Sequence, residues 1–226
     1  MYKRQNLLCE ILTSIEFPEG VINIVHGLGP SAGQSILEHP NIKAISFTGG
    51  TATGKIVAQT AAPMFKKLSL ELGGKNATII LDDADLLTAA KGAARAAFTN
   101  SGQVCLCGSR ILVADNIYDE FVTLLINEVE SMTIGNPSDE NTDIGSVISS
   151  EHMEKVLSYI ELAKQEGGKI SAGGSKLTLP PPNADGAFIE PTLIEGLAID
   201  SRCATEEIFG PVAVSYTHLR AHETNV

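Results

Sequence analysis

The sequence has 226 residues, of which 43% are apolar and 19% charged, and it contains 21 glycines. This composition is typical of a folded α/β protein and excludes a disordered or fibrous chain. The net charge of −11 argues against a nucleic-acid partner, because such proteins need a basic surface. No apolar run reaches the length of about 20 residues that a membrane span needs. The first residues also lack the apolar core of a secretory signal, so we expect a cytoplasmic protein.

The first part of the chain alternates between predicted strands and helices. Residues 21–25 (VINIV) predict a strand, and a helix opens near residues 31–39 (SAGQSILEH). Residues 43–48 (KAISFT) predict the next strand, and residues 53–62 (TGKIVAQTAA) predict the helix after it. This alternation favours right-handed crossovers and a parallel sheet.

The next two predicted strands enclose an acidic residue and a glycine pair. Residues 66–72 (KKLSLEL) and 76–83 (NATIILDD) predict the strands, and Glu71 comes just before Gly73 and Gly74. In open α/β sheets the functional crevice lies at the carboxyl ends of the strands. Glu71 is therefore a candidate functional residue.

The rest of the chain predicts further helices and strands. Residues 84–98 form an alanine-rich helical pattern through Leu86, Ala90, Ala94 and Ala97, and the small side chains predict close helix packing. The remaining predictions are a strand at 110–115, a helix at 116–132 with Asp115 or Asn116 as N-cap, a helix from Ser150 to the stop at Gly167, a loop at 179–186 and extended structure at 187–196.

The four cysteines are Cys9, Cys105, Cys107 and Cys203. They are too few and too irregularly spaced for a disulfide framework, so we interpret them as reduced thiols. The pair at 105 and 107 makes no tetrahedral metal site, because no second Cys or His pair lies at ligand spacing. We expect no metal site in this protein. One of the thiols is a candidate nucleophile, and Cys9 and Cys203 are assigned to packing.

The stretch ISFTGGTATGKI (residues 45–56) nearly matches the triphosphate-binding pattern G-x-x-x-x-G-K-[ST]. Gly49, Gly54 and Lys55 fit the pattern, but Ile56 lacks the hydroxyl that would bind magnesium. One hypothesis is therefore a nucleotide-binding module or triphosphatase, with Asp82 and Asp83 as further magnesium ligands. A purely structural glycine turn is the simpler alternative.

Three further motifs change the interpretation of this loop. They are LELGGK at 70–75, NSGQVC at 100–105 and EEIFGP at 206–211. Together with SFTGGTATG at 46–54, in this order, they resemble the aldehyde dehydrogenase superfamily, and the resemblance extends over residues 15–214. The segments KKLSLELGGKNATII and GQVCLCGSR are most similar in sequence to those of the branch that oxidises 2-aminomuconic or 2-hydroxymuconic semialdehydes.

The resemblance implies a fold, a chemistry and a set of site residues. The fold would be part of a Rossmann-like NAD(P)-binding domain (6–73) followed by an incomplete α/β catalytic domain (74–214). Cys105 would be the nucleophile that forms a thiohemiacetal and a thioester, and Glu71 the general base that activates water. The cofactor would be NAD, with NADP not excluded, and the cofactor-binding residues would be Gly29, Gly49, Gly54, Leu72, Gly73, Glu207 and Phe209. The whole protein would be a homo-oligomer acting on a small aldehyde.

Simpler alternatives exist for the same residues. Cys107 is the rival nucleophile, because in an extended segment it would point the same way as Cys105. Glu71 can be a solvated acid at a strand end, and Glu206 with Glu207 a solvated acidic pair. Backbone N–H groups near Cys105 can contribute to an oxyanion hole.

The ends of the chain and its length also lead to expectations. Family members are about twice as long, so we expect the chain to be truncated at both ends and inactive alone, with the oxyanion asparagine lying upstream. Residues 1–5 (MYKRQ) and 215–226 (beginning SYTHLRAHET) resemble translated sequencing-adapter sequence, and we expect them to be non-native. The spacing of His218 and His222 therefore carries no metal site.

Overall fold

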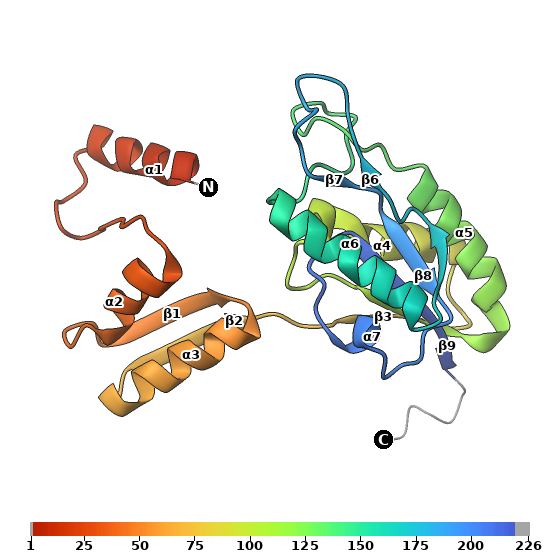
Figure 1. Cartoon of the computed structure of the whole chain (residues 1–226), viewed down its shortest axis with the longest axis horizontal. Helices are drawn as coiled ribbons and strands as arrows, with labels where there is room; N and C mark the ends of the chain where they lie inside the picture. The colour runs from red at the N-terminus through yellow and green to blue at the C-terminus, as the bar shows by residue number, and fades with distance from the viewer. Residues whose placement is uncertain (1, 220–226) are drawn as a thin grey trace. The chain divides into compact units, whose positions relative to one another are not determined.

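The computed structural model describes residues 2–219 of the chain. The chain folds as two compact units, Met1–Leu72 and Gly73–Val226, which are treated separately below (Figure 1). The boundary lies one residue before the one expected from the sequence. The functional labels attached to the two predicted domains stay a prediction.

The first unit is built around a two-stranded parallel sheet. Its elements are α1 (Tyr2–Ser14), η1 (Gly29–Gly33), α2 (Gln34–Glu38), β1 (Ala44–Gly49), α3 (Thr51–Ala61), η2 (Ala62–Met64) and β2 (Lys67–Leu72). The strands β1 and β2 pair in parallel, and α3 is the crossover between them. The predicted strands at 43–48 and 66–72 and the helix at 53–62 are therefore confirmed. Buried Leu37, Ile45 and Val57 form the core of this unit.

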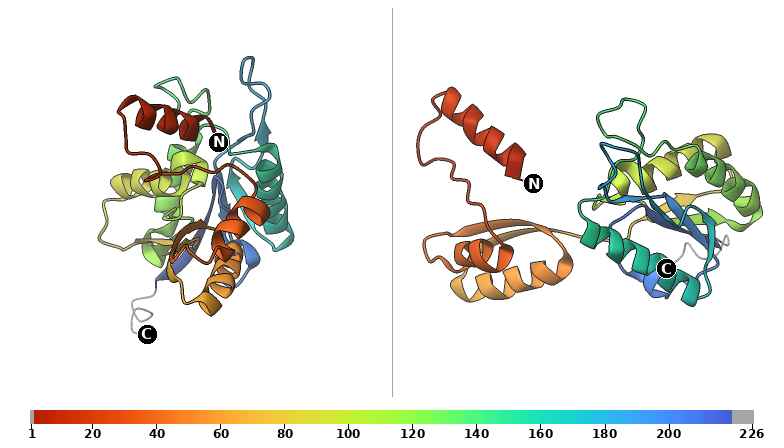
Figure 2. Two further views of the ribbon diagram at one scale, coloured as in Figure 1. Left: turned by 90° about the vertical axis from the view of Figure 1, so that its left-hand side faces the viewer. Right: turned by 45° about the horizontal axis from the view of Figure 1, so that its top comes forward.

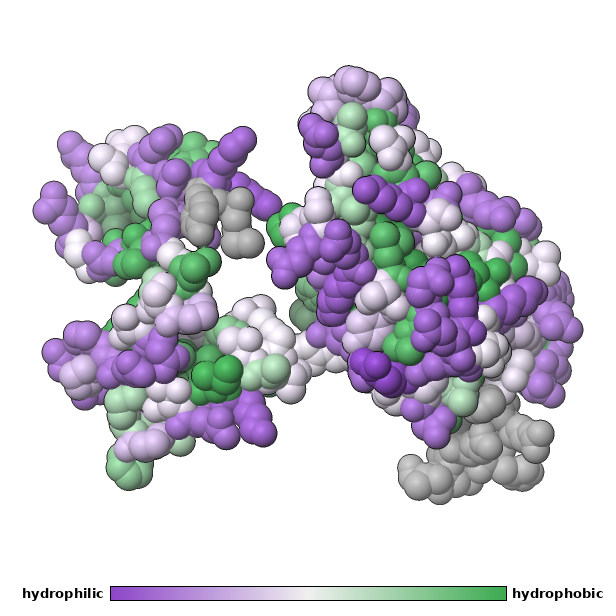
Figure 3. Space-filling model, viewed as in Figure 1, coloured by the Kyte–Doolittle hydropathy of each residue, from purple (hydrophilic) through white to green (hydrophobic). Residues whose placement is uncertain are grey.

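The predicted strand at residues 21–25 is wrong. These residues form no strand, and Val21 and Val25 are 65% and 66% exposed. A β-rich run becomes a strand only when a neighbour accepts its ladder hydrogen bonds. Here β1 pairs with β2 instead. Apolar residues lie at the surface of this unit (Figure 3).

The second unit contains a five-stranded mixed sheet. Its elements are β3 (Ala77–Ile80), α4 (Leu86–Phe98), η3 (Thr99–Gly102), β4 (Arg110–Ala114), η4 (Asp115–Ile117), α5 (Tyr118–Glu130), α6 (Ser150–Gln165), β5 (Lys169–Ala172), β6 (Lys176–Leu177), β7 (Phe188–Ile189), β8 (Thr192–Glu195), α7 (Arg202–Thr205) and β9 (Val212–Leu219). The strand order is β3-β4-β9-β8-β5, with parallel pairing except between β5 and β8.

Helices cover both faces of this sheet, as Figure 2 shows. The side chains of neighbouring residues in a strand point to opposite faces, so each central strand supplies both layers. Ala213 of β9 packs in the core with α4 and α5, whereas Val212 and Val214 pack in the core with α6. The alanine-rich prediction for α4 is confirmed, because Ala90, Ala94 and Ala97 are 0–1% exposed.

The predicted N-cap of α5 is wrong. Asp115 and Asn116 lie in the 3₁₀ turn η4, and the residue before the helix is Ile117, which makes no side-chain cap. Asp119 and Glu120 instead place negative charge in the first turn of the helix, where it interacts favourably with the helix dipole.

Three segments meet at the amino ends of neighbouring parallel strands. Residues 73–76 lead into β3, residues 103–109 lead into β4 and residues 206–211 lead into β9. Because β4 lies between β3 and β9 in the sheet, these segments lie side by side. The candidate residues of the second unit therefore precede strands, whereas Glu71 of the first unit lies near the carboxyl end of β2, as the sequence predicted.

Part of the expected non-native end continues the sheet. Ser215 and Tyr216 belong to β9 and are 1% and 3% exposed. The origin of both ends stays a prediction, although residues 2–5 belong to α1. His222 and the side chain of His218 lie outside the described residues. Within residues 2–219, no helix has the length and apolar character needed to cross a membrane.

Candidate active site

The cysteine loop of the second unit begins with an unusual backbone. Asn100, Ser101 and Gly102 follow one another with φ values of 53°, 56° and 68°. Left-handed geometry costs about 1–3 kcal/mol for a residue with a side chain, so the surrounding contacts must hold it. Ser101 supplies one of these contacts, because its Oγ donates to the carbonyl of Gly145 at 2.9 Å.

The two cysteines of this loop have different environments. Cys105 is exposed, whereas Cys107 is buried and its Sγ donates to the carbonyl of Ala97 at 2.8 Å. Burial raises the pKa of Cys107 to about 11, so this thiol stays protonated at neutral pH. The sequence suggested that both thiols point the same way, but the segment is a turn in which the N–H of Cys107 donates to the carbonyl of Val104. The accessible thiol of this pair is Cys105.

Polar groups surround Cys105 on its main-chain side. Asn76 Nδ2 donates to the carbonyl of Cys105 at 2.7 Å, and the carbonyl of Asn76 accepts from the N–H of Arg110 at 3.1 Å. Within residues 2–219, no acceptor binds the N–H of Cys105. This N–H is therefore free to stabilise an oxyanion on a group bound to the thiol.

Lys75 lies next to Asn76 and is a buried cation. Its ammonium group has no hydrogen-bond partner among the described residues, and it lines a narrow pocket together with Gly102, Cys107 and Glu207. Burial lowers the pKa of Lys75 to about 8. The cation therefore adds a positive field beside the cysteine loop at neutral pH, at a cost in stability.

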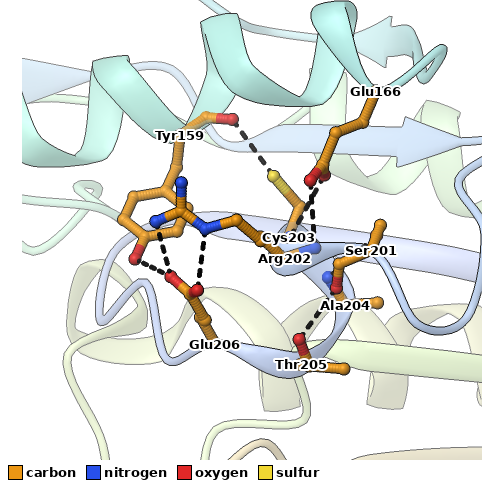
Figure 4. Close-up of polar contacts among 8 residues, drawn as sticks. All are labelled: Tyr159, Glu166, Ser201, Arg202, Cys203, Ala204, Thr205 and Glu206. Atoms are coloured by element: carbon orange, nitrogen blue, oxygen red, sulfur yellow. Dashed lines mark hydrogen bonds and ion pairs between the residues drawn. The ribbon is translucent and has the colours of Figure 1, made fainter.

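The adjacent Glu206 and Glu207 have separate roles in the structure. Glu206 accepts from Tyr159 Oη at 2.6 Å and from Arg202 Nε at 2.8 Å (Figure 4). These bonds hold the pKa of Glu206 at about 2. Glu207 instead accepts from the N–H of Gly74 at 3.2 Å. The two glutamates therefore do not act as one pair, because each is held by a different element.

The short helix α7 fixes the start of this acidic segment. Glu166, the residue that follows α6, accepts from the N–H groups of Arg202 and Cys203 at 3.1 and 3.3 Å (Figure 4). Cys203 is fully buried and its Sγ donates to the carbonyl of Tyr159. Its predicted packing role is confirmed. Cys9 was also assigned to packing, but it is exposed on α1, so that assignment is wrong.

Phe209 follows in a left-handed conformation, with a φ of 59°. His152 of α6 holds it, because His152 Nε2 lies 2.6 Å from the carbonyl of Phe209 and the two rings meet edge to face. Phe209 as a whole remains 37% exposed. The contacts of His152 thus hold the strained backbone of Phe209, and this conformation exposes the aromatic side chain to solvent beside Glu207.

The candidate residues of the first unit gather at one edge of its small sheet. In the parallel register Thr48 lies opposite Glu71, and Gly49 lies opposite Leu72. Glu71 is exposed and Leu72 is half-buried. The carboxyl ends of β1 and β2 therefore present the acid and the glycine loop together.

Two glycines of this loop lie close to neighbouring side chains. A Cβ on Gly54 would lie 2.4 Å from the side chain of Leu72, and one on Gly49 would lie 2.5 Å from Phe47. Gly54 is inside α3, and its missing side chain lets that helix approach β2. Gly29 opens η1 and is exposed, with nothing near its missing Cβ.

The triphosphate hypothesis loses support from this geometry. A triphosphate loop needs several non-helical residues between its glycines to wrap the phosphates. Here α3 begins at Thr51, and Lys55 is an exposed residue on that helix. What remains is a helix N-terminus without a side-chain cap after Gly50, which suits one or two phosphate groups.

Comparisons with known proteins agree on one family. The profile of the aldehyde dehydrogenase family matches residues 4–223. The chain belongs to this family. The 2-aminomuconic semialdehyde dehydrogenase of Danio rerio is 46% identical over 208 residues, which cover 91% of this chain and 43% of that protein. The 2-hydroxymuconic semialdehyde dehydrogenase of Pseudomonas sp. strain CF600 is 46% identical over 206 residues, covering 91% of this chain and 42% of that protein.

A solved aldehyde dehydrogenase structure has the same fold over the matched part. The betaine aldehyde dehydrogenase of Staphylococcus aureus, crystallised with NAD+, aligns with a TM-score of 0.87 at 40% identity, covering 93% of this chain and 41% of that chain. The predicted α/β aldehyde dehydrogenase fold is confirmed. The chain spans less than half the length of the curated relatives it matches.

Sequence and structure agree only partly on the site. The second unit brings together Gly73, Cys105, Glu207 and Phe209, whereas Glu71 belongs to the first unit. The pairing of Glu71 with Cys105 stays a prediction. Sequence reasoning missed Lys75, Asn76 and His152. Lys75 is the last residue of the LELGGK motif and Asn76 is the residue after it, but His152 has no comparable signal.

Proposed function

We propose that this chain is part of an NAD-dependent aldehyde dehydrogenase whose nucleophile is Cys105. The observation that carries the proposal is that the Cys105 thiol is exposed, on a loop held beside Glu207, whereas the thiols of Cys107 and Cys203 are buried. Burial raises the pKa of the two other thiols of the second unit, Cys107 and Cys203, to about 11 and about 12. Only a thiolate is a good nucleophile, so Cys105 suits the role best.

The proposed chemistry follows from the groups around this thiol. Cys105 Sγ adds to the carbonyl carbon of the aldehyde, and the carbonyl oxygen takes the electron pair of the broken π bond. The free N–H of Cys105 stabilises that oxyanion. NAD, when bound, supplies the hydride acceptor. Glu71 then takes a proton from the water that attacks the thioester, and Cys105 departs as the thiolate.

Each unit, taken by itself, offers groups that suit one part of a dinucleotide. The uncapped N-terminus of α3, which follows Gly49 and Gly50, suits a pyrophosphate, and Gly54 lets α3 pack on Leu72. Glu207 would accept hydrogen bonds from ribose hydroxyls, with Gly73 and Phe209 beside it. Gly29 would border the adenine. NADP stays an alternative, as does the homo-oligomeric state of the whole protein.

For the substrate we propose an acidic semialdehyde of the muconic type. The support is the 46% identity with relatives named for 2-aminomuconic and 2-hydroxymuconic semialdehydes. We also propose that the 226-residue chain alone does not turn over. Production of NADH from NAD and aldehyde by the purified chain would contradict this.

The test separates nucleophile from base in the whole protein. Cys105→Ala is expected to remove both the first turnover and the steady rate of NADH formation, because no covalent adduct forms. Glu71→Gln is expected to keep a burst of about one NADH per site and to lose the later turnovers, because only thioester hydrolysis needs the base. Cys107→Ala is the matched control and keeps most of the activity. Full activity of Cys105→Ala would disprove the proposal.

A further inference from the structure

Residues 73–76 touch both halves of the site in the second unit. Taking the proposed role of Cys105 as its basis, we propose that this segment is a two-armed clamp that positions Cys105 and Glu207 together. Asn76 is the arm toward the nucleophile, and Gly73 with Gly74 is the arm toward Glu207. We call residues 73–76 the clamp.

The first arm holds the main chain of the nucleophile. Asn76 Nδ2 donates to the carbonyl of Cys105, which is 29 residues away in sequence. The carbonyl of Asn76 accepts from the N–H of Arg110, at the point where β4 begins to pair with β3. Asn76 therefore binds the cysteine loop with its side chain and the sheet with its backbone. The position of the loop is thereby fixed relative to the sheet.

The second arm fits closely around the carboxylate of Glu207. The N–H of Gly74 donates to Glu207 Oε1 at 3.2 Å. A Cβ on Gly73 would lie 1.9 Å from Glu207 Oε2, closer than real Cβ atoms approach any neighbour. Gly73 must therefore lack a side chain for Glu207 to reach Gly74. No positive φ requires a glycine at position 73, so contact with Glu207 is the structural reason for it.

The two arms belong to one short run of chain. Gly74 also borders the carbonyl of Cys105, because a Cβ on Gly74 would lie 3.9 Å from that oxygen. The position of Glu207 is thus transmitted to Cys105 through the peptide units between Gly74 and Asn76. In a dehydrogenase such a link would set the carbon on the thiol at the correct distance from the nicotinamide.

The first experiment tests the donor of Asn76 in the 226-residue chain. Asn76→Asp keeps the shape of the side chain and replaces the N–H donor by a carboxylate oxygen. We expect the N–H of Cys107, which bonds within the loop, to exchange with solvent about fivefold faster than in the wild type at about pH 7.5. Near pH 4 the introduced carboxyl group becomes protonated and can donate again, so exchange is expected to return toward wild type. Asn127→Asp, on the exposed surface of α5, is the matched control.

A role limited to packing predicts another result. The isosteric Asn76→Asp would then keep wild-type exchange at both pH values, and that outcome would overturn the first arm. Asn76→Ala is expected to show fast exchange at both pH values, because it has no proton to regain. If Asn76→Ala does not fold, the pH dependence of Asn76→Asp still decides.

The second experiment tests the arm toward Glu207. Gly73→Ala and Glu207→Ala are expected to speed exchange of the Gly74 N–H about fivefold, whereas Glu207→Gln keeps an acceptor oxygen and is expected to retain protection. Gly92→Ala adds the same methyl group at an open position of α4 and serves as the control. Wild-type exchange in Gly73→Ala would overturn this arm.

The coupling of the arms has its own measurement. The rate at which iodoacetamide alkylates Cys105 is expected to change in both Asn76→Asp and Gly73→Ala, and to stay unchanged in both controls. A change in Asn76→Asp alone would show that the arms act independently and would overturn the clamp. These readouts use no aldehyde or cofactor. Failure of the proposed dehydrogenase function would leave them unaffected, and their failure would leave that function standing.

Discussion

The two units of the chain bury their side chains to very different extents. The second unit has two extensive apolar cores, one on each face of its sheet. The first has a core of three buried residues on a two-stranded sheet. Fourteen of the twenty-one large apolar residues that are exposed in the described part of the chain belong to the first unit, although it contributes less than a third of the residues.

This difference bears on how firmly each unit fixes the position of its candidate residues. Cys105 and Glu207 are bound by hydrogen bonds from elements that rest on the larger cores. Glu71 and Gly49 rest on a strand pair, and two strands alone are marginally stable. The geometry around Cys105 is therefore set within its own unit, whereas Glu71 and Gly49 belong to a unit with a small core and many exposed apolar residues.

Separation of the units is expected to have the largest effect. Residues 73–226 alone should unfold cooperatively in urea, because their cores are complete within the unit, with a free energy of unfolding on the order of 5 kcal/mol. Residues 1–72 alone should show no cooperative transition. Far-UV circular dichroism during urea titration measures both. A cooperative transition of residues 1–72 would show that the comparison between the units is mistaken.

A close backbone contact in the second unit gives the next effect. Gly102 has a φ of 68°, and a Cβ there would lie 2.0 Å from the carbonyl of Gly210. Gly102→Ala should lower the free energy of unfolding by about 2–4 kcal/mol, because neither backbone can yield. Gly196 also has a positive φ but open space around it. Gly196→Ala should thus cost only about 1 kcal/mol, and equal costs in urea titrations would refute the contact.

Two buried lysines extend the comparison to charge. Lys66 in the first unit donates to the carbonyls of Leu37 and His39 at 2.5 and 2.7 Å. Lys75 in the second has no such partner among the described residues. Lys75→Met should raise the free energy of unfolding by about 1–3 kcal/mol at neutral pH, because it removes an unpaired buried charge. Lys66→Met should lower it by a similar amount, because two carbonyls lose their donor.

The pH dependence checks the cause of this gain. The pKa of Lys75 in the folded chain is about 8, below its ordinary value of 10.5. Between these two values the unfolded chain binds more protons, so the wild type becomes more stable as pH rises. The nearby charged or titratable groups are Cys203, Cys107, Arg110 and Glu207. The advantage of Lys75→Met should therefore shrink above about pH 8 in urea titrations. An advantage that stays constant to about pH 10 would exclude the charge as its cause.

Local patterns in the sequence predicted much of the fold, because periodicity is a local property. The helix at 84–98 and the strand at 66–72 follow directly from it. Residues 21–25 failed, since a strand depends on a partner that no short window contains. Strand β9 was missed because its residues after position 214 were set aside as non-native.

The site was less predictable for a similar reason. The motifs identified Cys105 and Glu207, but the opposite environments of Cys105 and Cys107 depend on the left-handed backbone at Asn100 and Ser101. Asn100 belongs to a residue type that tolerates this backbone, but Ser101 carries no sign of it. The contact of Asn76 with Cys105 crosses 29 residues, and hydrogen bonds at that range arise only when the sheet has formed.

The smallest expected effect concerns the exposed acid of the second unit. Glu206 is bound by Arg202 and Tyr159, and its pKa of about 2 lies below the ordinary value of 4.5 (Figure 4). The stabilisation from these bonds is present above about pH 4.5 and is lost as the pH falls toward 2. Tyr159→Phe removes one donor, so the pKa of Glu206 should rise but stay below 4.5, because Arg202 still binds it. Carboxyl NMR titration measures this shift. Since Glu206 is solvent-exposed, stability at neutral pH should hardly change, and a large loss would mean that Tyr159 contributes mainly through packing.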